Sequence, residues 1–183
     1  MCEKVAEYLV SKPTYQYAVS KALETVFPNK IIYEDEKDIC WMIFEAVLFE
    51  DVRIGITHFS YFVEHAPLSS GYKRLYEVWN IRNLFGFFIV KKIVPEKEVH
   101  LTDLIGKAHF KVYEKQGTST LKKGAVIIVR IVPFLDGWMF YSETIVSHSG
   151  VTQEWMKNSY GVKVSQLMFA QKYRKKHNRQ WIG

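Results

Sequence analysis

Residues 121–147 constrain the fold of this chain more than any other stretch. The run 125–132 is rich in β-branched residues and too short for a typical helix, so it predicts a strand. Asp136-Gly137 follows, a pair typical of hairpin connections, in which it supplies the positive backbone angle. The apolar segment 138–146 then predicts a second strand. These residues indicate architecture and contain no catalytic signature.

The sequence around this hairpin predicts three more strands. One begins at Phe85 and ends near Pro95, a second begins at Val99, and residues 108–114 alternate apolar Phe110 and Val112 with polar neighbours. Turn signals at 96–97, 105–106, 116–118 and 136–137 separate the strands, and no helix-length crossover lies between them. We therefore expect a small five-stranded antiparallel barrel, OB-like or SH3-like.

The N-terminal half has helical periodicity. We expect helices over residues 2–11 and from Pro13 to about residue 26, an apolar helix with Asp35 as its N-cap, and two more around 59–63 and after Ser69 or Ser70. The predicted fold class is α+β. Its domains are a helical part (1–83), the β-barrel module (84–148) and a basic helical C-terminal tail (149–183).

A spaced set of apolar, glycine and charged residues runs from the helical half into the barrel module. It comprises Trp79, 84–88, 101–104, Phe110, Val112, 121–124, 129–133 and 136–138. This pattern resembles an uncharacterised region of bacterial proteins that in some of them lies near a SEC-C zinc motif. The resemblance covers residues 60–148 and implies helices followed by a compact β module, with no reaction to carry over. The cysteine-rich zinc motif itself is missing from the sequence, and Cys2 and Cys40 have no metal-type spacing.

Positive charge is concentrated at the C-terminal end. The chain has a formal net charge of +6, and residues 155–183 contain seven lysines and arginines and no acidic residue. In a helix, Lys172, Lys175, Lys176 and Arg179 share one face that fits a phosphate backbone. The same pattern also fits a solvated helix end, or a helix that binds an acidic protein or a membrane surface.

From these features we predict a non-enzymatic protein that binds nucleic acid, RNA more than duplex DNA. Basic side chains would neutralise phosphates while rings of the tail and the β module stack on bases. Other rings and cations of the module fit this view, although strand alternation places about half of such rings in the core. They are Phe85, Phe87, Tyr113, Lys91, Lys92, Lys111, Lys115, Lys122, Lys123 and Arg130. The predicted site residues are Lys172, Arg174, Lys175, Lys176, Arg179, Trp138, Tyr141 and Trp181. No cofactor or metal is expected.

Two alternatives stay open. One is an adaptor or assembly protein that uses rings of the helical half, and a homo-oligomer would use the same face: Tyr15, Tyr17, Tyr61, Tyr72, Tyr76 and Trp79. The other is a hydrolase in which His100 acts as a general base oriented by Asp103. The chain lacks an apolar run long enough for a membrane span and a signal-peptide pattern at its start, so a cytoplasmic location is expected.

Overall fold

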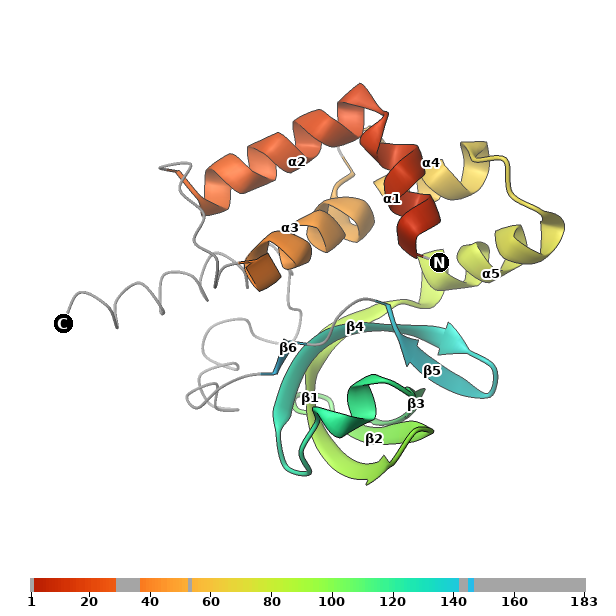
Figure 1. Cartoon of the computed structure of the whole chain (residues 1–183). Helices are drawn as coiled ribbons and strands as arrows, with labels where there is room; N and C mark the ends of the chain where they lie inside the picture. Colours follow the sequence, from red (N-terminus) through yellow and green to blue (C-terminus); the bar gives the residue numbers. More distant parts are fainter. Residues whose placement is uncertain (1, 29–36, 53, 142–144, 147–183) are drawn as a thin grey trace. The chain divides into compact units, whose positions relative to one another are not determined.

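A computed structural model of the chain describes residues 2–28, 37–52, 54–141 and 145–146. Within these ranges the protein is α+β, as predicted (Figure 1). It divides into two compact units, the first ending at Asn80 and the second beginning at Ile81. The helices are α1 (Cys2–Val10), α2 (Pro13–Val26), α3 (Lys37–Glu50), α4 (His58–His65) and α5 (Ser70–Arg82); the strands are β1 (Leu84–Val94), β2 (Glu98–Asp103), β3 (His109–Tyr113), β4 (Val126–Phe134), β5 (Gly137–Phe140) and β6 (Ile145–Val146).

Local signals in the sequence set the helix starts. Pro13 occupies the first turn of α2, where its missing N–H costs no hydrogen bond. Thr57 caps α4, because its Oγ1 accepts a hydrogen bond from the Ser60 backbone N–H at 3.0 Å. The predicted start at Pro13 is confirmed, and α5 begins at Ser70, directly after Ser69, one of the two predicted caps. The predicted cap Asp35 and the tail 149–183 lie outside the described residues. Among the helices described, none is both long and apolar enough to cross a membrane.

The helical unit has an aromatic core. The Phe59 ring lies 4.7 Å from that of Phe49 and 6.0 Å from that of Tyr76, and Tyr76 contacts Trp79 edge-on at 5.4 Å. Tyr76 and Phe59 are fully buried, and Trp79 is nearly so. Since aromatic rings bury the largest apolar areas, this cluster is the main hydrophobic contribution to the unit.

Buried polar groups join α2, α3 and α4 in the same unit. Tyr15 packs edge-on against the buried His58 ring at 5.2 Å, and His58 Nε2 lies 4.0 Å from Asp51 Oδ2. Burial, assisted by the negative charge of the buried Glu45, raises the pKa of Tyr15 to about 12. The Tyr15 hydroxyl therefore stays protonated in the folded protein at any ordinary pH.

The second unit is the predicted five-stranded barrel. Around the ring the strand order is β1-β2-β3-β5-β4, and β4 pairs again with β1 to close it. The strand β1 pairs with two neighbouring strands. Its residues 84–89 pair with β4 and its residues 88–94 pair with β2, and the β1–β2 pairing has a register shift between Val90 and Lys92. One pairing differs from the all-antiparallel expectation, because β3 and β5 run parallel. The strand order resembles the Greek-key order of OB-like barrels.

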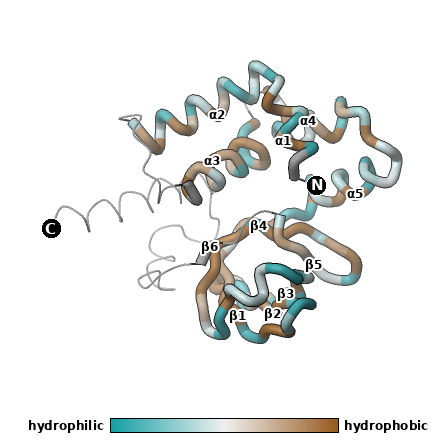
Figure 2. Tube along the Cα trace, in the orientation of Figure 1, coloured by the Kyte–Doolittle hydropathy of each residue, from teal (hydrophilic) through white to brown (hydrophobic). Residues whose placement is uncertain are grey.

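The barrel interior follows from the two-residue period of the strands. Val99 and Leu101 of β2, Val112 of β3, and Ile127 and Val129 of β4 point inward and are buried, and their neighbours point outward. Figure 2 shows this alternation as brown and teal bands along the strands, with brown dominating β4. The core is completed by Phe88, Val90, Leu121, Ile131 and Phe140.

The connection between β4 and β5 differs from its prediction. Phe134 pairs with Gly137, so Leu135 and Asp136 form the turn, and the positive φ of 52° belongs to Leu135. The prediction that Asp-Gly supplies this angle is therefore wrong. Gly137 has a different role: a Cβ on it would lie 2.7 Å from the Lys111 carbonyl oxygen and 3.2 Å from the Tyr113 ring. Glycine is required there because β5 approaches β3 too closely for a side chain.

The close approach at Gly137 predicts the effect of a single methyl group. Gly137→Ala should lower the free energy of unfolding by about 1–3 kcal/mol, because the Lys111 backbone has to move to make room. Chemical denaturation measures the change. Gly71→Ala in α5 is the control, since a Cβ there meets no heavy atom within 4 Å. Equal unfolding midpoints for both variants would contradict the tight contact.

The aromatic core predicts a second stability difference. Tyr76→Ala should lower the free energy of unfolding by about 4 kcal/mol, because it leaves a large cavity among Phe59, Phe62 and Trp79. The matched control is Tyr17→Ala in α2, where the side chain is 61% exposed and the expected change is below about 1 kcal/mol. Urea unfolding followed by circular dichroism compares the two, and similar losses would contradict the assignment of Tyr76 to the core.

Candidate functional site

The structure places two of the eight predicted site residues, Trp138 and Tyr141. Trp138 is half-buried, packs edge-on against Phe110 at 5.4 Å and borders the barrel core. Tyr141 is only 6% exposed, so its ring offers little surface for stacking, and we do not retain it as a stacking residue. The other six, Lys172, Arg174, Lys175, Lys176, Arg179 and Trp181, lie outside the described residues.

Several other rings and cations named from the sequence are fixed inside the second unit. Phe87 is fully buried. Arg130 is 3% exposed, its Nη1 donates a hydrogen bond to Asn83 Oδ1, and its guanidinium lies 5.6 Å from the centroid of the Phe85 ring. A buried arginine needs such partners because its charge is costly to remove from water. Phe87 and Arg130 therefore act in packing and not as a solvent-facing surface.

The outward side of β2 and β3 is polar. Cross-strand partners on it are Thr102 with His109, His100 with Lys111, and Glu98 with Tyr113. On the other side of β2, Lys92 of β1 pairs with His100. We call the surface formed by Lys92, Glu98, His100, Thr102, His109, Lys111 and Tyr113 the β2–β3 face. Its side chains are half-buried or exposed, in contrast to the buried Val99, Leu101 and Val112 between them.

Hydrogen bonds order both histidines of the β2–β3 face. His100 Nε2 lies 3.0 Å from Glu98 Oε1, and His109 Nδ1 lies 2.9 Å from the Thr102 hydroxyl. The hydrogen bond with His100 lowers the pKa of the Glu98 carboxyl. The face therefore presents fixed polar groups that can donate or accept hydrogen bonds to a ligand.

Asp136, at the tip of the β4–β5 connection, reaches across to β3. Its Oδ2 lies 2.6 Å from Lys111 Nζ, and its Oδ1 accepts a hydrogen bond from the Tyr113 hydroxyl. Lys111 Nζ also lies 5.0 Å from the centroid of the Tyr113 ring. The hydrogen bonds from Lys111 and Tyr113 lower the pKa of Asp136 to about 2, and the bond to Asp136 raises the pKa of Lys111. We call this contact the Asp136 bridge.

Two connections border the β2–β3 face. The β1–β2 connection (residues 95–97) carries the exposed Lys97, and the Glu96 backbone N–H donates to the buried Thr118 hydroxyl at 3.1 Å. The β4–β5 connection carries Leu135, whose side chain is 80% exposed although its φ is positive. An exposed apolar side chain on such a backbone is unusual, and strained positions of this kind concentrate at functional sites.

The Asp136 bridge predicts a low pKa for the Asp136 carboxyl that depends on Lys111. In the folded protein Asp136 should titrate with a midpoint near pH 2, against an ordinary value of 3.8. Because the folded-state pKa is depressed, the bridge stabilises the fold fully above about pH 4, and this contribution is lost as the pH falls through about 2. Carboxyl-carbon NMR measures the midpoint. Lys111→Met should raise it toward 3.8, and a wild-type midpoint already at 3.8 would contradict the bridge.

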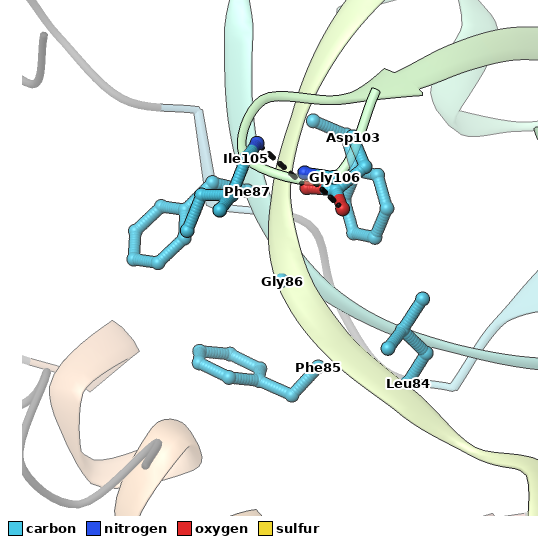
Figure 3. Close-up of a pocket in the computed structure, with 8 residues that line it drawn as sticks. Leu84, Phe85, Gly86, Phe87, Asp103, Ile105 and Gly106 are labelled. Carbon is cyan, nitrogen blue, oxygen red and sulfur yellow. Dashed lines mark hydrogen bonds between the residues drawn. The ribbon is translucent and has the colours of Figure 1, made fainter. Parts of the chain in front are cut away.

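His100 and Asp103, suggested as a base and its orienting carboxylate, make other contacts. Residues three apart in a strand face opposite sides, and His100 contacts Glu98. The Asp103 carboxylate accepts hydrogen bonds from the backbone N–H groups of Ile105 at 3.0 Å and Gly106 at 2.8 Å (Figure 3). Asp103 thus closes the β2–β3 turn beside a small apolar pocket of about 150 Å³, lined by Leu84, Phe85, Gly86, Phe87, Phe88, Asp103, Ile105 and Gly106.

The rings proposed for a protein-binding surface divide into two groups. Tyr15, Tyr76 and Trp79 are 8% exposed or less and belong to the core of the helical unit. Tyr17 and Tyr72 are 61% and 42% exposed, and Tyr61 is half-buried with its ring stacked on His65 at 4.2 Å. Helical periodicity alone does not separate these groups, because each tyrosine is amphipathic and fits either side.

Sequence reasoning missed the role of Asp136, which it assigned only to a turn. It named Lys92 and Lys111 as cations of the β module without choosing them as site residues, and it assigned Lys97 only to a turn. No local signal links Asp136 with Lys111, since they are 25 residues apart and meet only when the barrel closes. The alternation of residues 98–103 and 109–113 does predict a polar outer side, and this was the available signal.

The fold and this face define a two-unit α+β protein that carries a closed, mixed, five-stranded barrel. Residues 1–178 match the model of a family of unknown function, DUF7986, and the chain belongs to that family. Neither a curated protein nor a solved structure matched the chain. Within the described ranges, no three His, Cys, Asp or Glu side chains group closely enough to hold a metal ion.

Proposed function

We propose that this protein binds single-stranded nucleic acid, RNA in preference to duplex DNA, and that it acts without catalysing a reaction on it. The observation that carries this proposal is the position of its exposed polar surface in the barrel. OB-like barrels bind oligonucleotides on the outer side of strands 2 and 3 and on the connections 1–2 and 4–5. In this chain that place is occupied by the β2–β3 face, Lys97 and the β4–β5 connection.

The chemistry of the face suits a single strand. Lys92, Lys97 and Lys111 can neutralise phosphates, and Tyr113 supplies a half-buried ring on which a base can stack. Glu98, His100 and Thr102 present fixed donors and acceptors to base edges. In a duplex those edges and ring faces are already occupied by pairing and stacking, so a face of this kind favours unpaired bases.

The tail contributes the second part of the proposal. Lys172, Arg174, Lys175, Lys176 and Arg179 would extend the phosphate contacts beyond the barrel, and Trp181 would add a stacking ring. Trp138 keeps a partly exposed ring next to β3 and stays in the proposal.

Binding of a fluorescein-labelled single-stranded RNA of about 12 nucleotides, within the site size of one OB barrel, tests the proposal. Affinity of the full chain, measured by anisotropy across a salt series, should fall steeply with salt. The double variant Lys92→Gln with Lys97→Gln should bind more weakly, and the slope of log affinity against log salt should become shallower by about 1.4.

The matched control removes the same charge elsewhere. Lys73→Gln with Arg74→Gln changes two exposed cations of α5 and should leave the slope nearly unchanged. A third variant, with the five tail cations changed to glutamine, measures how much the tail contributes to the affinity for RNA. Absence of binding at low salt, or equal losses in the two double variants, would refute the assignment to the β2–β3 face.

A second candidate is a protein-binding role for the helical unit. It is favoured by the exposure of Tyr17 in α2 (61%) and Trp41 in α3 (55%), since such rings are common at interface hot spots. Cross-linking of the full chain that depends on Tyr17 and Trp41, together with no binding to RNA, would favour this candidate over the first.

A further inference from the structure

The Asp136 bridge engages two side chains of the β2–β3 face that could otherwise bind a phosphate. Lys111 and Tyr113 are the two groups best suited to hold a phosphate oxygen there, one by charge and one by its hydroxyl. Both are already engaged by a single carboxylate, with one oxygen on each: Oδ2 at 2.6 Å from Lys111 Nζ and Oδ1 on the Tyr113 hydroxyl. A carboxylate with two oxygens held in this way has the charge and the acceptor geometry of a phosphodiester.

We propose that the Asp136 carboxylate competes with a phosphate of the ligand for Lys111 and Tyr113. The carboxylate must leave these two side chains before a nucleic-acid strand can bind across the β2–β3 face. This inference rests on the proposed function and adds its regulation. The ligand group is a phosphodiester in the backbone of a single nucleic-acid strand. On binding, one phosphate replaces one carboxylate at Lys111 and Tyr113.

The position of Asp136 allows such an exchange. Its side chain is 71% exposed and that of Lys111 is 33% exposed, and ion pairs in water are weak because the solvent screens them. Asp136 lies in a two-residue turn, so it can move without disturbing the barrel ladder, which resumes at the Phe134–Gly137 pair. The released carboxylate can be solvated at once.

The β4–β5 connection has a second feature that fits this role. Leu135 has a positive φ of 52° and an 80% exposed side chain, a combination that costs stability compared with glycine. A change of conformation in the connection would relieve this strain. The turn thus carries both the competing carboxylate and an apolar group next to it.

The competition changes the salt dependence of binding. In the wild type, added salt weakens the contact of Lys111 with the phosphate and also the competing contact of Lys111 with Asp136, so part of the salt effect cancels. Without the Asp136 charge only the phosphate contact remains, and its salt dependence comes in full from the cations that leave the neutralised phosphate. Removal of the carboxylate should therefore raise the affinity and make the salt dependence steeper.

The experiment measures binding of the full chain to the same labelled RNA of about 12 nucleotides across a salt series. Asp136→Asn should bind about threefold more tightly, with a slope of log affinity against log salt steeper by about 0.7. Tyr113→Phe removes a hydroxyl that serves both the bridge and the phosphate contact, so its affinity should stay close to that of the wild type. The charge control is Glu77→Gln on the exposed surface of α5, with little change in either quantity.

The outcomes separate this inference from the proposed function. Salt-dependent binding by the wild type, with Asp136→Asn no tighter than Glu77→Gln, overturns the competitor role and leaves the proposed function standing. If Asp136→Asn binds the RNA and the wild type does not, the result supports the competitor role and shows that the carboxylate blocks binding completely. Absence of binding by the wild type and both bridge variants at low salt overturns the proposed function and the competitor role together.

Discussion

The parallel contact between β3 and β5 is the constraint on which the second unit depends. It consists of the pairs Val112–Trp138 and Tyr113–Met139, and it closes a ring that is otherwise antiparallel. The contact is possible because Gly137 has no Cβ to collide with the Lys111 carbonyl oxygen. Closure brings the β4–β5 connection beside β3, so that Asp136 meets Lys111 and Tyr113. The geometry of the β2–β3 face is therefore a consequence of how the barrel closes.

The outer surface of the barrel has two different sides, although every strand follows the same alternation. Outward residues of β4, and of the part of β1 that pairs with it (residues 84–89), are apolar or paired: Phe87, Ile128 and Val132 are almost completely buried, and Arg130 is held by Asn83 and Phe85. Outward residues of β2 and β3 are polar and accessible. The difference arises from composition at equivalent positions, since burial of an unpaired charge is costly and exposure of a large apolar patch is unfavourable. Within the described strands, the β2–β3 face thus offers accessible hydrogen-bonding groups to a ligand.

An internal carboxylate on a cationic face has a general physical effect. A polyanion gains less from a lysine that is already paired than from one that holds only mobile counterions. A weak or short anionic ligand is then less able to displace the internal carboxylate from the lysine. A nucleic-acid strand makes several contacts at once, and these together outweigh the loss of the one internal ion pair. Such an arrangement favours extended ligands over isolated phosphates without any additional contact surface.

The sequence by itself determined the features that depend on neighbouring residues. Pro13 begins a helix, Thr57 and Ser60 are close enough in the chain to form a cap, and the alternation around Val99, Leu101 and Val112 defines which side of each strand is buried. The tertiary structure decided the rest: the parallel closure, the positive φ at Leu135 in place of Gly137, the burial of Phe87 and Tyr141, and the contact of Asp136 with Lys111. These depend on residues that are far apart in the chain, and their energies exist only once the barrel has closed, so no local pattern encodes them.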